Sequence, residues 1–144
     1  MTSHASSAPV TRCVSDLMSD HLIVVRADAP LAEAARLIDR HSVTGLPVVD
    51  EMGALVGVLS QTDLIRARTS EHLWTGWPGL AVRHLMTSPA LTTHGSTPVA
   101  EAARQMERAG VHRLVVVADD DPHRAIGVIS TSDLVRDMAN EVSR

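Results

Sequence analysis

The chain of 144 residues carries two copies of one unit, and this duplication constrains its fold more than any other feature. The sequence Ala-Glu-Ala-Ala-Arg stands at 32–36 and again at 100–104, and Gly-Val-Leu-Ser at 57–60 returns as Gly-Val-Ile-Ser at 127–130. Apolar residues recur around these blocks: Val14, Leu17, Met18, Val43, Leu46 and Val48 correspond to Val82, Leu85, Met86, Val111, Leu114 and Val116. A tandem duplication explains the match. Halves of about 70 residues would be marginal alone, so they should share a core.

Both copies predict the same order of secondary structure. Apolar side chains spaced i, i+3, i+4 and i+7 after a proline indicate a helix with one buried face. Paired runs of branched side chains around a polar turn indicate a hairpin. The predicted elements are short strands near 22–25 and 90–93, helices after Pro30 and Pro98, hairpins of 46–49 with 54–59 and of 114–118 with 125–129, and closing helices from Ser60 and Ser130. The predicted fold class is therefore α+β, built from a duplicated β-α-β-β-α unit.

The segment between the copies has no counterpart in the repeat. It contains Gly, Pro and both tryptophans, Trp74 and Trp77, and its composition is typical of a linker. The predicted layout is a flexible N-terminus at 1–9, a first repeat at 10–68, a linker at 69–81 and a second repeat at 82–141.

The composition argues against several classes of function. Thirteen Lys and Arg against seventeen Asp and Glu give a formal net charge of −4, without the broad positive field that nucleic acids and anionic membranes select. With no Phe, no Tyr and two Trp, stacking on bases is almost unavailable. A single cysteine, Cys13, suits a reducing compartment, and no apolar run is long enough to cross a bilayer. The histidines lack the spacing of a zinc site. We expect a cytoplasmic protein without a nucleic acid, membrane or metal partner.

The start of each closing helix carries a serine and, three residues later, an aspartate: Ser60 with Asp63, and Ser130 with Asp133. One interpretation is a capping box, in which the two side chains satisfy backbone N–H groups of the first turn. A second is a binding site, because a carboxylate there can accept both hydroxyls of a ribose, and the free N–H groups of a helix start can receive a phosphate. The two interpretations are compatible. Thr131, next to Ser130, belongs to the second one.

The duplicated unit, the Gly-Leu-Pro-Val-Val-Asp stretch at 45–50 and the pattern Gly-aliphatic-aliphatic-Ser-x-x-Asp that closes each copy resemble the cystathionine-beta-synthase (CBS) domain pair over roughly residues 10–140. The resemblance implies two repeats about a pseudo-twofold axis, with their sheets against each other and two clefts for adenosyl ligands such as AMP, ATP or S-adenosylmethionine. It also implies a regulatory role without catalysis or a required cofactor, and a homodimer. No nucleophile paired with a base stands out. With no further domain in the sequence, we expect the signal to reach an effector protein in trans.

The second copy carries a basic pair, His112 and Arg113, just before a predicted strand, where the first copy has Thr44 and Gly45. In the resembling family such a pair often accompanies phosphorylated adenosine, and a guanidinium is a planar, permanent cation suited to phosphate. Taken without the family, it would be an ordinary surface pair. Because only the second copy carries it, we expect unequal clefts and a larger role for Asp133 than for the aspartate of the first copy.

Adenine would then lie between aliphatic side chains and bond to the backbone of extended segments. The predicted ligand-binding residues are Ser130, Thr131, Asp133, His112, Arg113, Ser60, Asp63, Thr44, Gly45, Leu46, Pro47, Ile23, Val24 and Leu91. The alternative function is a structural adaptor for dimerisation whose clefts no longer bind a ligand, since each copy lacks one part of the pattern that the other retains.

Overall fold

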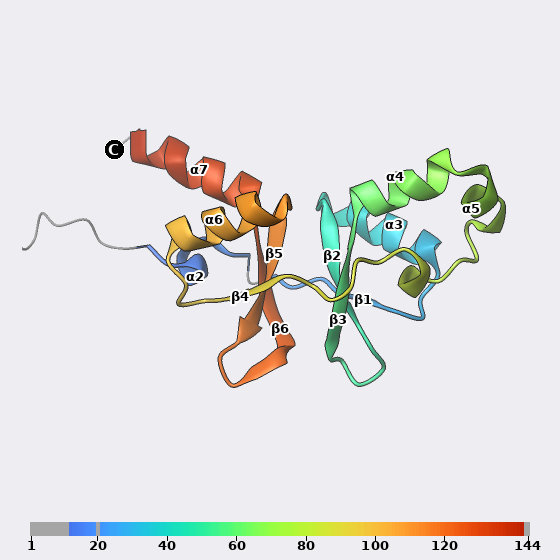
Figure 1. Ribbon diagram of the computed structural model, residues 1–144, viewed down its shortest axis with the longest axis horizontal. Coiled ribbons are helices and arrows are strands. Elements are labelled where there is room, and N and C mark those ends of the chain that lie inside the picture. The colour runs from blue at the N-terminus through green and yellow to red at the C-terminus, as the bar shows by residue number, and fades with distance from the viewer. Residues whose placement is uncertain (1–11, 20, 143–144) are drawn as a thin grey trace, which may run out of the picture.

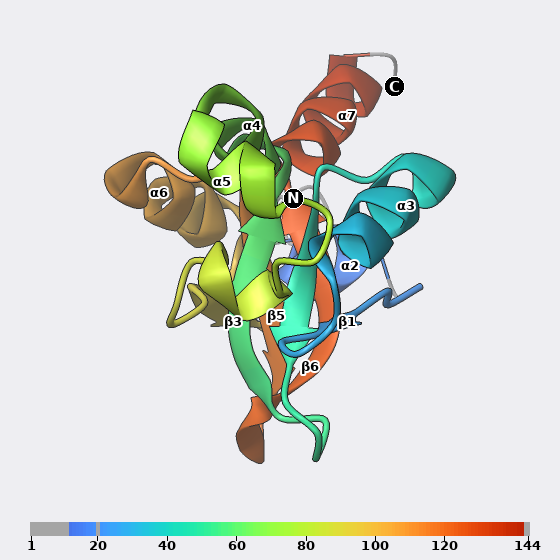
Figure 2. The same cartoon turned by 90° about the vertical axis from the view of Figure 1, so that its right-hand side faces the viewer.

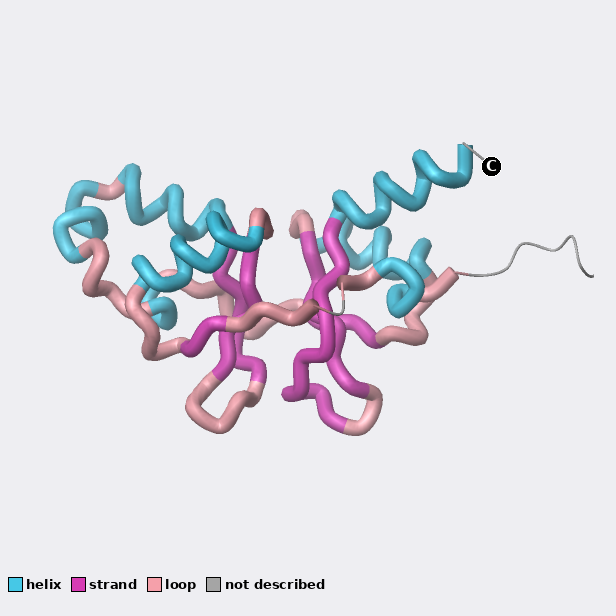
Figure 3. Tube along the Cα trace, turned by 180° about the vertical axis from the view of Figure 1, so that it is seen from behind, coloured by secondary structure: helices cyan, strands magenta, loops and turns pink. Residues whose placement is uncertain are grey.

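The computed structural model describes residues 12–19 and 21–142. Two three-stranded sheets stand side by side in the middle of the molecule, and the longer helices flank them on the outside (Figure 1). The helices that close the two units lie at one end of the molecule and the hairpin turns at the other (Figures 1 and 2). Figure 3 shows the same arrangement from behind. In each sheet the middle strand runs parallel to the first strand and antiparallel to the third.

The order of elements confirms the predicted β-α-β-β-α unit in both copies. The first unit contains β1 (Val25–Arg26), α3 (Leu31–His41), β2 (Gly45–Val49), β3 (Leu55–Ser60) and α4 (Gln61–Thr69). The second unit contains β4 (Thr92–His94), α6 (Val99–Ala109), β5 (Arg113–Ala118), β6 (Asp121–Ser130) and α7 (Thr131–Val142). Among the described residues, three short helical segments lie outside these units: α2 (Val14–Leu17), α5 (Glu71–Gly76) and the 3₁₀ turn η1 (Val82–His84).

The structure differs from the expected boundaries at the second hairpin. Strand β6 begins at Asp121, before the predicted segment 125–129, because Asp121 pairs with Ala118. The extra residues of the second copy thus lengthen its hairpin instead of enlarging a loop. The first strand of each unit also begins later than expected, by three residues at Val25 and by two at Thr92.

The segment predicted as a linker contains the helix α5. Its start is capped by the hydroxyl of Ser70, which accepts a hydrogen bond from the Leu73 N–H at 3.2 Å. The rings of Trp74 and Trp77 stack with their centroids 5.4 Å apart, and the guanidinium of Arg68 lies 4.4 Å from the Trp74 ring centroid. Trp77 also packs against the core of the first unit, so the two rings hold this segment to α4 and to that core.

The segment that leads into each repeat packs against the other repeat. Val14 in α2 is fully buried in the core of the second unit beside Met106 and Leu114. Its counterpart Val82 in η1 is fully buried in the core of the first unit beside Leu31. Backbone hydrogen bonds also join each leading segment to the other repeat. The Val14 N–H donates to the Thr97 carbonyl at 2.9 Å, and the Val82 N–H donates to the Ala29 carbonyl at 2.8 Å. Neither core is complete without a segment of the other copy.

Each exchanged segment continues across the third strand of the repeat it joins, and a glycine marks the crossing. The Thr87 N–H donates to the Val58 carbonyl at 2.8 Å and the Val58 N–H donates back at 2.9 Å. A Cβ atom at Gly57 would lie 2.7 Å from the Thr87 carbonyl oxygen, and one at Gly127 would lie 2.8 Å from that of Ser19. Only a residue without a Cβ atom permits such a close approach of two backbones. This contact accounts for the glycine in both copies of the Gly-Val-aliphatic-Ser motif.

The two units also bury side chains against each other. Leu55 of β3 and two residues of β5, Val115 and Val117, are buried in one cluster to which Val58 and Ala125 contribute. This cluster joins the two sheets, as the resemblance to a domain pair implies. The shared interior explains how two units of this size form one stable body.

We expect Gly127→Ala to lower the free energy of unfolding by about 1–3 kcal/mol, because its Cβ atom would press on a backbone carbonyl that cannot rotate away. The control is Gly79→Ala, where the nearest atom to the added Cβ would be 3.7 Å away. Chemical denaturation of both variants measures the difference. Equal stabilities for the two variants would contradict the proposed role of the crossing.

Candidate functional site

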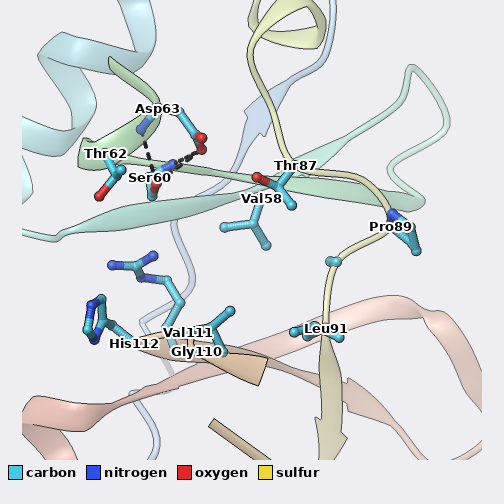
Figure 4. A pocket seen from close by; sticks show the side chains of 12 residues that line it. Val58, Ser60, Thr62, Asp63, Thr87, Pro89, Leu91, Gly110, Val111 and His112 are labelled. Carbon is cyan, nitrogen blue, oxygen red and sulfur yellow. Dashed lines mark hydrogen bonds between the residues drawn. The ribbon is translucent and has the colours of Figure 1, made fainter. Parts of the chain in front are cut away.

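Two clefts of similar size lie between the units. Cleft 1 has a volume of about 300 Å³ and cleft 2 about 290 Å³. Cleft 1 is lined by Val58, Ser60, Thr62, Asp63, Thr87, Pro89, Ala90, Leu91, Gly110, Val111, His112 and Arg113 (Figure 4). Cleft 2 is lined by Ser19, His21, Leu22, Ile23, Ser42, Val43, Thr44, Gly45, Arg113, Val128, Ser130, Ser132, Asp133 and Arg136.

Each cleft combines parts of both repeats. Cleft 1 takes the start of α4 from the first repeat and residues 87–91 and 110–113 from the second. Cleft 2 takes the start of α7 from the second repeat and residues 19, 21–23 and 42–45 from the first. The crossing segments produce this arrangement, because each carries the chain of one repeat past the last strand of the other. Any ligand that fills a cleft must therefore touch both repeats.

The helix starts have the predicted capping box. In cleft 1 the Asp63 Oδ2 atom accepts from the Ser60 N–H at 2.8 Å and from its hydroxyl at 3.0 Å, and the Asp63 N–H donates to the Ser60 Oγ atom at 3.2 Å. Ser130 and Asp133 repeat these bonds in cleft 2 at 2.8, 3.1 and 3.3 Å. Figure 4 shows the first set at the wall of cleft 1. The backbone of each helix start thus holds one carboxylate at a cleft.

The second oxygen of each carboxylate faces an arginine one turn later on the same helix. The Asp63 Oδ1 atom lies 3.4 Å from the Arg66 Nη2 atom, and the Asp133 Oδ1 atom accepts from the Arg136 Nη1 atom at 3.1 Å. Both arginines are exposed and can turn toward solvent, while the carboxylates, which are largely buried, stay in place. A ligand hydroxyl can therefore compete for the Oδ1 atoms at small cost.

The residue that lines cleft 2 beside Asp133 is Ser132, and not the predicted Thr131. Thr131 lies on the other side of the helix start, where its N–H donates to the His112 carbonyl at 2.9 Å and it faces a groove against α6. Ser132 and its counterpart Thr62 are exposed and line their clefts. The recurrence of a hydroxyl at this position in both copies was a signal that could have identified them.

Of the basic pair, His112 lies in the cleft that holds the aspartate of the opposite copy, while Arg113 lines both clefts. His112 is exposed and lines cleft 1 together with Asp63. Asp133 lies in cleft 2, with Thr44 and Gly45. Because the clefts are assembled across the repeats, His112 shares a cleft with Asp63 and not with Asp133.

Arg113 differs from His112 because it lines both clefts. Its Nη2 atom donates to the Thr44 Oγ1 atom at 2.9 Å, at the side of cleft 2. Burial lowers the pKa of the Arg113 guanidinium, and the carboxylate of Asp63 in cleft 1 acts in the opposite direction. The group is nonetheless charged at neutral pH, because an arginine does not deprotonate in proteins. A single permanent cation thus stands between the two clefts.

Gly45 makes room for this cation. In the duplication Gly45 is the counterpart of Arg113, and the two residues are neighbours across the pseudo-twofold axis. A Cβ atom at Gly45 would lie 2.9 Å from the Arg113 Nε atom and 3.0 Å from its Cδ atom. The guanidinium therefore occupies space that a side chain at position 45 would fill.

The structure separates the remaining predicted residues into two groups. Ile23 lines cleft 2 and Leu91 lines cleft 1, as expected for aliphatic walls. Leu46 is fully buried in the core, Pro47 is buried, and Val24 lies at the surface beside the buried Val25; none of these three side chains lines either cleft. Leu46 and Pro47 belong to a strand that is buried along most of its length. Residues that the prediction missed include Val58, Thr62, Thr87, Ser19, His21, Ser132 and Arg136.

The part of the chain that the structure describes offers neither a metal centre nor a membrane-spanning helix. Within it, no three His, Cys, Asp or Glu side chains gather as a metal ion would require. Of the described helices, none has the length and apolar character needed to cross a membrane.

Comparison with known proteins places the duplicated unit in a family. The model of the CBS domain matches the chain twice, over residues 14–70 and 82–140. These two segments contain both helix starts and the basic pair.

Solved structures and a curated relative agree with this match. The CBS domain pair of protein MJ0100, solved with 5'-methylthioadenosine and S-adenosyl-L-methionine, has a TM-score of 0.80 and 26% identity, covering 92% of this chain and 99% of that one. CBSX2 of Arabidopsis thaliana, solved with AMP, has a TM-score of 0.77 and 33% identity over the same shares. L-aspartate semialdehyde sulfurtransferase of Methanocaldococcus jannaschii is 29% identical over 129 residues, which are 90% of this chain and 23% of that enzyme. The chain thus spans less than a quarter of that relative.

Proposed function

Because this chain belongs to the CBS domain family, we propose that it is a non-catalytic regulatory module that binds an adenine nucleotide or another adenosyl ligand between its repeats. One observation carries the proposal: cleft 1 brings together a carboxylate held at a helix start, a permanent cation and aliphatic walls. These are the groups that a ribose, a phosphate and an adenine require. The AMP complex of CBSX2 and the S-adenosyl-L-methionine complex of MJ0100 support the ligand class.

Each part of an adenosine phosphate has a partner in cleft 1. The Asp63 carboxylate would accept the ribose hydroxyls, because its place at the helix start is maintained by the capping box. Arg113 would bind the phosphate, with the hydroxyl of Thr62 beside it. Adenine would lie between Val58 on one repeat and Leu91 on the other. In Figure 4 these two side chains stand on opposite walls of the cleft.

Binding would transmit a signal through the relative position of the two repeats. Since each cleft has one wall from each repeat, a ligand that contacts both walls favours one spacing of the walls over others. An effector protein that recognises this spacing would receive the signal in trans. The alternative, an adaptor without ligand, predicts no response to any adenosyl compound. A panel of nucleotides in thermal unfolding distinguishes the two, because a ligand at 100 times its Kd adds about 2.7 kcal/mol of stability.

A homodimer is the second part of the proposal. Apolar side chains remain exposed on the closing helices: Ile65 of α4 at 60%, and Val135 and Met138 of α7 at 62% and 67%. Both helices lie at the same end of the molecule (Figure 2). Burial of these side chains against a second copy would remove apolar surface from water, which favours association.

We expect Arg113→Ala to weaken AMP binding by about ten- to a hundredfold, because a charge-assisted contact contributes roughly 1.5–3 kcal/mol, and to change adenosine binding little. Calorimetry with both ligands measures the two losses. The control is Arg104→Ala, which removes the same charge from α6, outside both clefts. An equal loss for adenosine and AMP in Arg113→Ala would exclude the phosphate role.

We expect light scattering to give the mass of a dimer at micromolar concentration, and Met138→Glu to give a monomer, because a charge in an apolar interface is costly. Met52→Glu is the matched control, since Met52 is 85% exposed at the hairpin turn, at the opposite end of the molecule. A wild-type monomer, or dissociation by both variants alike, would argue against this interface.

A further inference from the structure

The chain has one arginine between its two clefts where the duplication offers two positions. The strand that follows the first helix of each unit begins with Gly45 in β2 and with Arg113 in β5. These equivalent positions are neighbours, and a Cβ atom at Gly45 would lie 2.9 Å from the Arg113 Nε atom. The space near the pseudo-twofold axis is therefore filled by a single long side chain.

This side chain lines both clefts. Toward cleft 2 its Nη2 atom donates to the Thr44 hydroxyl at 2.9 Å. Toward cleft 1 its charge interacts with the carboxylate of Asp63, although no hydrogen bond joins them in this conformation. The bond to Thr44 is with a neutral hydroxyl, so an anion in either cleft would be a stronger partner for the guanidinium.

The other basic side chains at the clefts, His112 and Arg136, differ between cleft 1 and cleft 2. His112 lines cleft 1 and is exposed. Arg136 lines cleft 2 and is exposed, and its Nη1 atom donates to the Asp133 Oδ1 atom at 3.1 Å, so a phosphate there would have to draw it away from that carboxylate. Because the chain has a formal net charge of −4, no general positive field replaces a specific cation.

We propose that Arg113 can serve a phosphate in either cleft but not in both, so that two phosphorylated adenosyl ligands antagonise each other while one phosphorylated and one uncharged ligand are compatible. This inference rests on the proposed function, and it adds a rule for which pairs of ligands occupy the clefts together. The second phosphate would bind without Arg113 and close to the negative charge of the first phosphate. Linkage makes the antagonism reciprocal: each phosphorylated ligand weakens the other by the same factor.

The test compares the intact chain with variants that have one cleft filled. Thr62→Trp and Ser132→Trp are a matched pair, because the two residues occupy equivalent, exposed positions in clefts 1 and 2 and neither belongs to a core. Calorimetry with adenosine checks the design, since each variant should bind one molecule where the wild type binds two. Thr62→Leu and Ser132→Leu repeat the experiment with a smaller side chain if either tryptophan impairs folding.

For AMP, we expect the product of the two wild-type association constants to be about ten- to a hundredfold lower than the product of the constants of the two filled-cleft variants. For adenosine, the two products should agree. Adding Arg113→Ala to all three chains should remove the deficit for AMP. A deficit of equal size for adenosine, a deficit that persists without Arg113, or a filled-cleft variant that binds adenosine but not AMP would each overturn the inference. If neither ligand binds the wild type, the proposed function itself is wrong and the inference fails with it.

A second measurement tests whether the Thr44 hydroxyl competes with a phosphate for the Arg113 guanidinium. Thr44→Val removes the hydroxyl that holds Arg113 toward cleft 2, so in the Ser132→Trp background it should raise AMP affinity in cleft 1 by about threefold or more and leave adenosine affinity unchanged. Thr44→Ser retains the hydroxyl and should leave both affinities unchanged. An AMP affinity that does not rise in Thr44→Val would mean that the cation is not shared.

Discussion

The close contact of two backbones at Gly57 and at Gly127 is the constraint on which the rest of this structure depends. At each point the segment leading into one repeat crosses the third strand of the other, and a carbonyl oxygen lies where a Cβ atom would be. The crossing delivers Val82 to the core of the first unit and Val14 to the core of the second. Neither repeat can therefore complete its interior alone, and the two form one body. The clefts arise from the same crossing, which is why each has walls from both repeats.

On this nearly symmetric scaffold, one difference between the copies lies at the boundary of both clefts. Equivalent aspartates are held in the same way at both helix starts, with the serine N–H at 2.8 Å in each case. The strands that begin opposite them differ, with Arg113 in one copy and Gly45 in the other. Gly45 also has a structural role, because the absence of a side chain there leaves the space that the Arg113 guanidinium occupies. In the function we propose, the symmetry would supply two binding places for adenosine. The difference between Arg113 and Gly45 would limit how many phosphorylated ligands these places hold at once.

The sequence predicted the fold well because a duplication tests each pattern twice. The helical spacing after Pro30 and Pro98 and the serine–aspartate caps were visible in both copies, and the structure confirms these helices and caps. The duplication did not predict that His112 and Asp63 line the same cleft. Hydrophobic periodicity reveals which face of an element is buried but not which copy buries it, and only the crossing decides that. Leu46 was assigned to the site through the backbone of its extended segment, and the structure places its side chain in the core.

A crystal structure of the chain with AMP tests most directly whether each binding site is assembled across the repeats. If it is, the molecule whose ribose contacts Asp63 also contacts Leu91 and His112, so that one ligand joins the helix start of the first repeat to the strands of the second. A ligand bound to Asp63 that instead contacts Ile23 and other residues of the first repeat, leaving the second untouched, would contradict the account.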